Sequence, residues 1–126
     1  MRIEHVALWV SDLEKEKAFY LAFPGAIASP MYRNAGKGFE SVFISFSGGA
    51  RLELMRKDGV TEKSERTGLG WAHLAFSMGS PVKVDEMTKT LQKTGHRLLG
   101  GPRVTGDGYY ESLFEDREGN LLELTI

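Results

Sequence analysis

The feature that most constrains this sequence is an internal duplication. A short apolar run that begins with a histidine occurs twice, at residues 5–8 and again at residues 73–76. Three further matches follow: residues 36–39 with 106–109, 39–43 with 110–114, and 52–54 with 122–124. The separations at these anchors lie between 68 and 71 residues, so one register holds along the chain. We therefore expect two copies of one supersecondary unit.

The first copy predicts a strand, a helix and three more strands. Residues 3–10 have the apolar pattern of a strand, and Ser11-x-x-Glu14 is a capping box that predicts a helix over residues 12–22. The last three strands are expected at residues 26–32, 39–46 and 50–56, with glycine-rich turns at 36–38 and 47–49. Pro30 favours an edge position for the first of these three strands.

The second copy predicts the same order of elements. Its histidine strand covers residues 70–77, and Ser80-Pro81 starts a helix that ends at Gly95. Strands are expected at residues 96–99, 109–115 and 120–126, and residues 100–108 have the glycine content of either a mobile lid or a plain connection.

The whole pattern predicts an α+β fold, in which two tandem βαβββ modules form a curved mixed sheet around a central cavity. The modules cover about residues 1–56 and 70–126, joined by a polar connector at 57–69. A chain of 126 residues has the size of one domain, which we expect to span residues 1–126.

Composition excludes several functions. The formal net charge of -1 gives no basic field for nucleic acid. No apolar run approaches the ~18 residues of a membrane helix, and Glu4 and His5 stand where a secretory signal needs its apolar segment, so we expect a cytoplasmic location and no membrane partner. Without cysteine, any metal must be held by histidine, carboxylate or water.

The duplication places a histidine on the first strand and a glutamate on the last strand of each module. These residues are His5 and Glu53, then His73 and Glu123. All four interrupt apolar runs, where an unpartnered polar group is costly. If a pseudo-twofold axis relates the modules, the four side chains converge with two nitrogen and two oxygen donors. Such a set suits divalent zinc, nickel, cobalt, manganese or iron.

Three sequence patterns extend this likeness to a known family. They are Val10-Ser11-Asp12-Leu13-Glu14 with Ala18-Phe19-Tyr20, then His73 in its strand, then Asp116-x-x-Gly119-Asn120-x-x-Glu123. With them, the chain resembles the vicinal oxygen chelate superfamily of glyoxalases, bleomycin-resistance proteins and extradiol dioxygenases. The resemblance covers essentially all 126 residues.

Within that superfamily, the ligand set His5, Glu53, His73 and Glu123 resembles that of glyoxalase I. The resemblance implies a metal-dependent lyase or isomerase that acts on a small α-hydroxycarbonyl or thiol hemithioacetal through an enediolate. Zinc, nickel or cobalt is the cofactor it favours, and Glu123 and Glu53 are the candidate bases. Glyoxalase I commonly has arginine and asparagine where this chain has Trp9 and Lys57, which argues against glutathione as the thiol.

Other members of the superfamily supply competing hypotheses. A protein that sequesters an antibiotic, as in the bleomycin-resistance branch, characteristically lacks the four ligands. An extradiol dioxygenase uses two histidines and one glutamate around ferrous iron, so Glu53 argues against it. A metal-dependent thiol transferase is a further relative. Small members usually form homodimers, and in these the modules of two chains can complete each site.

Residues around the predicted ligands are candidates for binding a small-molecule substrate. Trp9 shares a strand face with His5, while Arg51 and Met55 flank Glu53, although strand ends also place such residues on plain surface or at a dimer contact. Arg103 in the glycine-rich segment is a candidate anion contact. Glu40 and Glu111 match across the copies and are interpreted as solvated. His96 has no counterpart and is interpreted as a surface or helix-end residue.

Overall fold

The computed structural model describes residues 1–63 and 69–126. The chain divides into two compact units, Met1–Ser64 and Glu65–Ile126. Residues 64–68 of the predicted connector lie outside the described residues. Among the residues described, no helix is long and apolar enough to cross a membrane.

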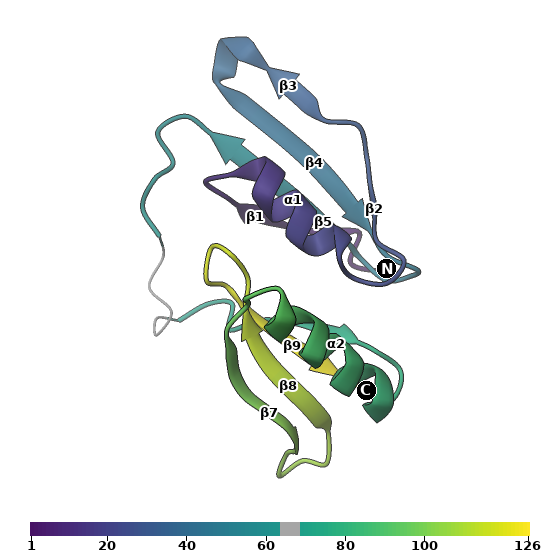
Figure 1. Ribbon diagram of the computed structural model, residues 1–126. Helices are drawn as coiled ribbons and strands as arrows, with labels where there is room; N and C mark the ends of the chain where they lie inside the picture. The colour runs from purple at the N-terminus through teal and green to yellow at the C-terminus, as the bar shows by residue number, and fades with distance from the viewer. Residues whose placement is uncertain (64–68) are drawn as a thin grey trace. The chain divides into compact units, whose positions relative to one another are not determined.

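The first unit is a five-stranded sheet with one α-helix (Figure 1). Its elements are β1 (His5–Trp9), α1 (Leu13–Leu21), β2 (Ile27–Ala28), β3 (Tyr32–Asn34), the short 3₁₀ helix η1 (Ala35–Lys37), β4 (Phe39–Ser45) and β5 (Arg51–Lys57). The strand order is β1-β5-β4-β2, and β3 also pairs with β4. β1 is parallel to β5, whereas the other pairs are antiparallel.

The second unit repeats this plan with four strands (Figure 1). Its elements are β6 (Leu74–Ser77), α2 (Pro81–Lys93), β7 (Leu98–Val104), β8 (Tyr110–Glu115) and β9 (Leu121–Thr125). The strand order is β6-β9-β8-β7, with β6 parallel to β9. The prediction of two βαβββ modules in an α+β fold is confirmed. In the first module Pro30 separates β2 from β3, since proline cannot donate to a strand ladder.

One face of each sheet packs against the helix of its own unit. The buried sheet residues are Val42, Ile44, Leu52 and Leu54 in the first unit and Phe114, Leu122 and Leu124 in the second. The helices cover them with Leu13, Phe19 and Tyr20 of α1 and with Val84, Met87 and Leu91 of α2. Because strand side chains alternate, the residues between these point to the opposite side, which we call the open face.

The helix starts agree with the sequence prediction in one unit and differ by one residue in the other. Ser80 caps α2 as predicted, because its side chain accepts a hydrogen bond from the Lys83 amide. The cap of α1 is Asp12, whose carboxylate accepts from the Lys15 amide, so the prediction of Ser11 as the cap was wrong. Aspartate serves as well as serine at this position.

The predicted loop at residues 100–108 is mostly a strand. β7 runs from Leu98 to Val104 and pairs with β8, so the predictions of a lid and of a strand ending at residue 99 were wrong. Two register shifts in this pairing accommodate the glycines. Gly101 has a φ of 82°, and a Cβ atom there would lie 2.4 Å from the carbonyl oxygen of Glu111. The glycines therefore allow two backbones to approach closely.

Candidate metal centre

The first unit brings His5 and Glu53 together on its open face. β1 and β5 are parallel neighbours, and their register places Ala7 directly opposite Glu53. His5 lies two residues before Ala7, so its side chain leaves the sheet on the same side. The distance between His5 Nε2 and Glu53 Oε2 is 3.8 Å, and the side chains are 41% and 16% exposed.

The second unit contains a corresponding histidine–glutamate pair. His73 immediately precedes β6, and Ala75, two residues later, lies directly opposite Glu123 on β9. The distance between His73 Nε2 and Glu123 Oε2 is 3.5 Å, and the side chains are 42% and 17% exposed. The duplication therefore preserves a histidine–glutamate pair with an alanine beside it, whose small side chain leaves space over the carboxylate.

A carboxylate orients the first histidine. His5 Nδ1 lies 2.6 Å from Glu4 Oε2, and Arg51 Nη2 lies 2.5 Å from Glu4 Oε1. The hydrogen bond from His5, followed by the interaction with Arg51, lowers the pKa of Glu4. A proton on His5 Nδ1 satisfies this contact and leaves the Nε2 lone pair free on the side of Glu53. Metal-ligating histidines commonly have such a partner.

A second carboxylate adjoins Glu123. Burial raises the pKa of Glu123, and so do a hydrogen bond and charge repulsion from Glu111, against an opposing effect of His73. Glu111 lies on β8, pairs in register with Thr125, and has a side chain that is only 14% exposed. Glu123 therefore holds a proton more readily than an ordinary carboxylate, which suits a group that accepts one in a reaction.

The structure separates Glu40 from Glu111, which the sequence comparison had paired. Phe43 lies opposite Glu53 and Leu113 lies opposite Glu123, so the match of residues 39–43 with 110–114 is shifted by one residue. A shift of one residue exchanges the two faces of a strand. Glu111 consequently lies on the open face beside Glu123, and its interpretation as a solvated group was wrong.

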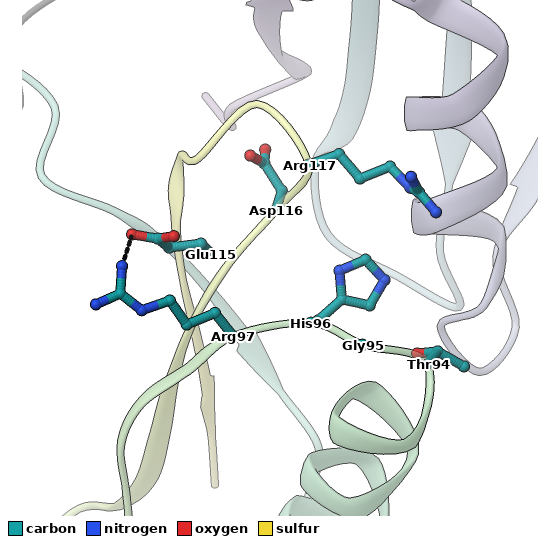
Figure 2. Close-up of a pocket in the computed structure, with 7 residues that line it drawn as sticks. All are labelled: Thr94, Gly95, His96, Arg97, Glu115, Asp116 and Arg117. Carbon is teal, nitrogen blue, oxygen red and sulfur yellow. Dashed lines mark ion pairs between the residues drawn. The ribbon is translucent and has the colours of Figure 1, made fainter.

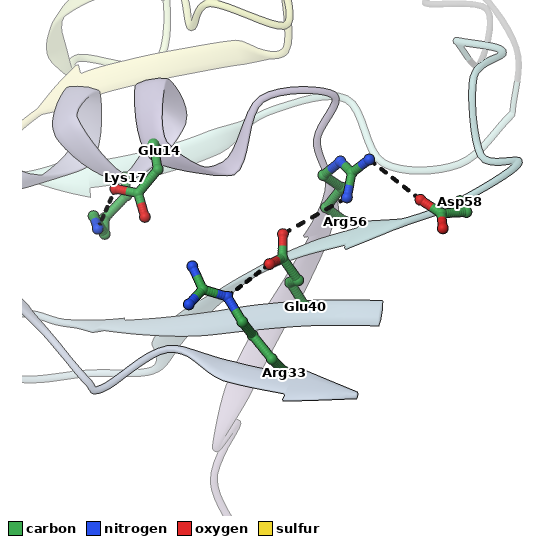
Figure 3. A network of polar contacts seen from close by, with 6 residues as sticks. All are labelled: Glu14, Lys17, Arg33, Glu40, Arg56 and Asp58. Carbon is green, nitrogen blue, oxygen red and sulfur yellow. Dashed lines mark hydrogen bonds and ion pairs between the residues drawn. The ribbon is translucent and has the colours of Figure 1, made fainter. Parts of the chain in front are cut away.

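Glu40 instead belongs to a polar network on the other face of the first sheet (Figure 3). Its carboxylate lies 2.8 Å from Arg33 Nε and 3.6 Å from Arg56 Nη1, and Arg56 also contacts Asp58 at 3.2 Å. These pairs tie β3, β4 and the end of β5 together. Glu40 therefore has a structural role at the sheet edge.

The remaining predicted pocket residues divide between the units. Trp9, Arg51 and Met55 lie on the open face with Glu53, since Trp9 pairs with Met55 in register and Arg51 lies two residues before Glu53. Arg103 lies on β7 and not in a loop, with Nη2 3.5 Å from Glu111 Oε1. Arg103 therefore already has a carboxylate partner in the second unit.

The Asp116-x-x-Gly119-Asn120 pattern shapes the turn that leads into β9. The Asp116 carboxylate accepts hydrogen bonds from the backbone amide of Asn120 at 2.7 Å and from its side-chain amide at 2.8 Å. Gly119 takes a φ of 74°, and its amide donates to the Asp116 carbonyl. This turn fixes where β9 begins and thereby places Glu123 beside β6.

A pocket of about 330 Å³ lies next to this turn, at the end of α2 (Figure 2). Its lining is polar and consists of Thr94, Gly95, His96, Arg97, Glu115, Asp116 and Arg117. Burial and the nearby Arg117 lower the pKa of His96, while Asp116 opposes them. His96 follows the helix end as predicted, and its amide donates to the Leu91 carbonyl. None of the predicted ligands lines this pocket.

The histidine–glutamate pairs are thus separate features of the two units. Within residues 1–63 and 69–126, no three or more histidine and carboxylate side chains are grouped so as to hold a metal ion. Each unit by itself supplies one nitrogen and one oxygen donor.

Comparison with known proteins identifies the family to which this arrangement belongs. The sequence model of the Glyoxalase/Bleomycin resistance protein/Dioxygenase superfamily matches residues 2–124. The chain belongs to this superfamily. The resemblance inferred from the sequence patterns is therefore confirmed.

Individual proteins resemble the chain in sequence or in fold. The chain is 30% identical over 126 residues to the uncharacterized protein YqjT of Bacillus subtilis, an alignment that covers 97% of this chain and 96% of the relative. A glyoxylase/bleomycin resistance protein/dioxygenase domain from Frankia has the same fold, with a TM-score of 0.85, 22% identity, and coverage of 100% and 97%. The trypanothione-dependent glyoxalase I of Leishmania major is similar in fold, with a TM-score of 0.78, 21% identity, and coverage of 99% and 86%.

Proposed function

We propose that this protein is a metal-dependent lyase or isomerase of the glyoxalase I type. The observation that carries the proposal is the repeated pair, in which each unit brings one histidine and one glutamate within 4 Å on its open face. The four proposed ligands are His5, Glu53, His73 and Glu123. The proposal places both pairs around one divalent ion, within a single domain or across a homodimer.

The geometry of each pair fits shared ligation of one ion. Two ligand atoms that each lie about 2.1 Å from a metal are roughly 3 to 3.5 Å apart. The nitrogen–oxygen distances of 3.8 and 3.5 Å come close to this range. Two imidazole nitrogens and two carboxylate oxygens suit zinc, nickel or cobalt, with manganese or iron as further candidates. When bound, such an ion acidifies a carbon next to a coordinated carbonyl or hydroxyl group.

The chain itself supplies the group that moves the proton. In the proposed reaction a carboxylate takes a proton from the carbon that bears the hydroxyl group and returns it to the neighbouring carbonyl carbon. The hydroxyl proton passes to the former carbonyl oxygen, so no oxidant or second substrate is needed. Glu123 is the first candidate, because burial and Glu111 raise its pKa. Glu53, the corresponding residue of the other pair, is the second. The substrate is a small α-hydroxycarbonyl or thiol hemithioacetal.

The first test of this proposal is the metal content of tag-free protein, measured by elemental mass spectrometry in the wild type and in Glu53→Ala. We expect about one divalent ion per chain in the wild type and a loosened or lost ion in the variant. If neither protein holds metal after incubation with zinc, nickel and cobalt, the lyase proposal fails and a ligand-sequestering function replaces it.

The second test concerns the proton-moving residue. Hemithioacetals formed from methylglyoxal and several small thiols are screened for turnover, and the best substrate is then used with Glu123→Gln. We expect the rate per bound metal ion to fall by a factor of 10² to 10⁴, as for removal of a general base, while circular dichroism changes little. The rate is expressed per bound ion because Glu123 is also a proposed ligand. Glu86→Gln, an exposed carboxylate on α2, is the matched control. An unchanged rate in Glu123→Gln would exclude it as the base.

A further inference from the structure

A group of aromatic side chains lies on the open face of the first unit, beyond the proposed ligand Glu53. It consists of Trp9 on β1, Tyr32 on β3 and Phe39 on β4, which we call the aromatic patch. The ring centroids of Trp9 and Phe39 are 6.3 Å apart at an angle of 86°, and those of Tyr32 and Phe39 are 6.1 Å apart at 58°. Trp9 is 47% exposed and Tyr32 is 55% exposed, so the patch is open to a ligand.

The strand pairing fixes the distance between the patch and the ligand pair. One row across the sheet contains Trp9, Met55, Ser41 and Tyr32, and the preceding row contains Ala7, Glu53 and Phe43. Adjacent rows on one face are about 7 Å apart, since each residue advances a strand by about 3.3 Å. A spacing of about 7 Å matches the length of one phenyl ring attached to the substrate atoms that lie next to Glu53.

Two of the residues in these rows have small side chains. Ala7 lies opposite Glu53, and Ser41, opposite Met55, is buried beneath its neighbours. Trp9 and Tyr32 rise at the two ends of the row that contains Ser41. Between the two exposed rings the row therefore carries Met55 and the small, buried Ser41.

Charge is concentrated at the opposite end of the same face. Arg51 lies in the row of His5, with its guanidinium carbon 4.1 Å from the ring centroid of Phe43, and Glu4 neutralises it. At the aromatic end, exposed Lys57 lies past the patch, opposite Phe39 at the rim. A substrate that spans this face therefore meets apolar rings on the Trp9 side of Glu53.

The size of the patch favours a small ligand over a second protein chain. An aromatic side chain has about 150–250 Å² of surface to bury, and Trp9 and Tyr32 are each about half exposed. Together they offer on the order of 200 Å², whereas a stable protein interface needs about 800 Å² per partner. A phenyl ring matches the smaller area.

We propose that the substrate carries a planar aromatic group next to its two chelating oxygens, and that Trp9, Phe39 and Tyr32 bind this group. The proposal rests on the metal-dependent function proposed above and names the substrate class of that site. The aromatic patch sets specificity, whereas the histidine–glutamate pairs perform the chemistry.

The test compares two chelators that differ only in the group next to their paired oxygens, benzohydroxamate and acetohydroxamate. Binding to the metal-loaded protein is measured by calorimetry and by fluorescence in a Trp71→Phe background, in which Trp9 is the sole tryptophan. We expect benzohydroxamate to bind at least about tenfold more tightly, because ring stacking and burial favour the phenyl group. Trp9→Ala and Phe39→Ala should remove most of this preference.

The control is Tyr109→Ala, which removes an exposed tyrosine of the second unit and should leave the preference unchanged. If both hydroxamates bind equally well to the wild type, the aromatic inference is overturned while the metal site stands. If Trp9→Ala or Tyr32→Ala converts a dimer to a monomer in light scattering, the patch is an interface between copies, and the inference is again overturned.

A metal-free measurement separates this inference from the proposed function. If no metal loads, the Trp9 indole N–H signal is followed by NMR in Trp71→Phe while benzyl alcohol, and separately ethanol, is added. A saturable shift with benzyl alcohol alone, lost in Phe39→Ala, supports the aromatic site without the metal. No shift, or the same shift with ethanol, overturns it.

Discussion

At the scale of single residues, the two copies have diverged around their glutamates. Glu53 and Glu123 occupy corresponding positions, but a neighbour on the adjacent strand differs. It is Ser41 of β4 in the first unit and Glu111 of β8 in the second. Glu111 raises the pKa of Glu123 together with burial. This asymmetry is our reason for proposing Glu123 before Glu53 as the group that transfers the proton, although the duplication alone treats the two glutamates alike.

We predict that Glu111→Gln lowers the pKa of Glu123 in the metal-free protein, as measured by carbon NMR of the carboxyl group. The pKa of Glu123 in the folded protein lies above its ordinary value of 4.5. The folded state therefore binds more protons than the unfolded state, and the free energy of unfolding falls as pH rises from 4.5 through the folded pKa. Urea unfolding should show a smaller fall in the variant.

The control for this prediction is Glu86→Gln, which removes an exposed carboxylate from α2, away from the strand pairs. Its pH dependence of stability should follow that of the wild type. If Glu111→Gln leaves the Glu123 titration unchanged, Glu111 is not a cause of the raised pKa, and burial with repulsion from Asp107 accounts for it.

At the scale of elements, β7 shows how glycines can form part of a strand. Gly101 has a φ of 82° and its α-carbon faces the backbone of Glu111 and Ser112. The close approach keeps β7 on β8 through two register shifts, and β8 carries Glu111 next to Glu123. The glycines of β7 thus help to position a residue of the proposed site.

We predict that Gly101→Ala destabilises the protein by about 2 kcal/mol or more, since a non-glycine residue in this conformation costs 1–3 kcal/mol before any clash. The added Cβ would also lie 2.4 Å from the Glu111 carbonyl oxygen. Gly106→Ala is the matched control, because its Cβ would meet nothing within 4 Å and its φ is not in the left-handed region. Urea unfolding distinguishes the two, and equal stabilities would contradict this account of β7.

The sequence predicted most elements because their signals are local. Ser80 and Pro81 start α2 where expected. The single strand predicted at residues 26–32 was wrong, because two short strands lie on either side of Pro30. The other failures came from interactions that are distant in sequence. Gly100 and Gly101 are strand residues because they pair with β8. The sheet face on which Glu111 lies depends on the register between β8 and β9. The sequence match between the two copies was shifted by one residue and therefore assigned Glu111 to the wrong face.

In the molecule as a whole, each of the two copies contributes one histidine and one glutamate to the proposed metal site. Each unit provides one pair, and neither pair has enough donors for a four-coordinate site. Two independent pairs would give two weak sites per chain, whereas a joint site gives one. The stoichiometry of metal binding therefore tests whether the two copies act as one.

We predict that His5→Ala and His73→Ala each abolish nearly all tight metal binding, and that neither variant retains half of it. Each change removes one of the two histidine ligands of a shared four-ligand site and leaves three ligands. The two variants should therefore lose metal to the same extent. His96→Ala removes the third histidine of the chain, which lies outside both pairs, and should keep the full metal content. Metal per chain is measured by elemental mass spectrometry after dialysis against a weak chelator. Half occupancy in both histidine variants would mean that each unit binds its own ion, in which case the duplication has produced two sites and the shared centre is wrong.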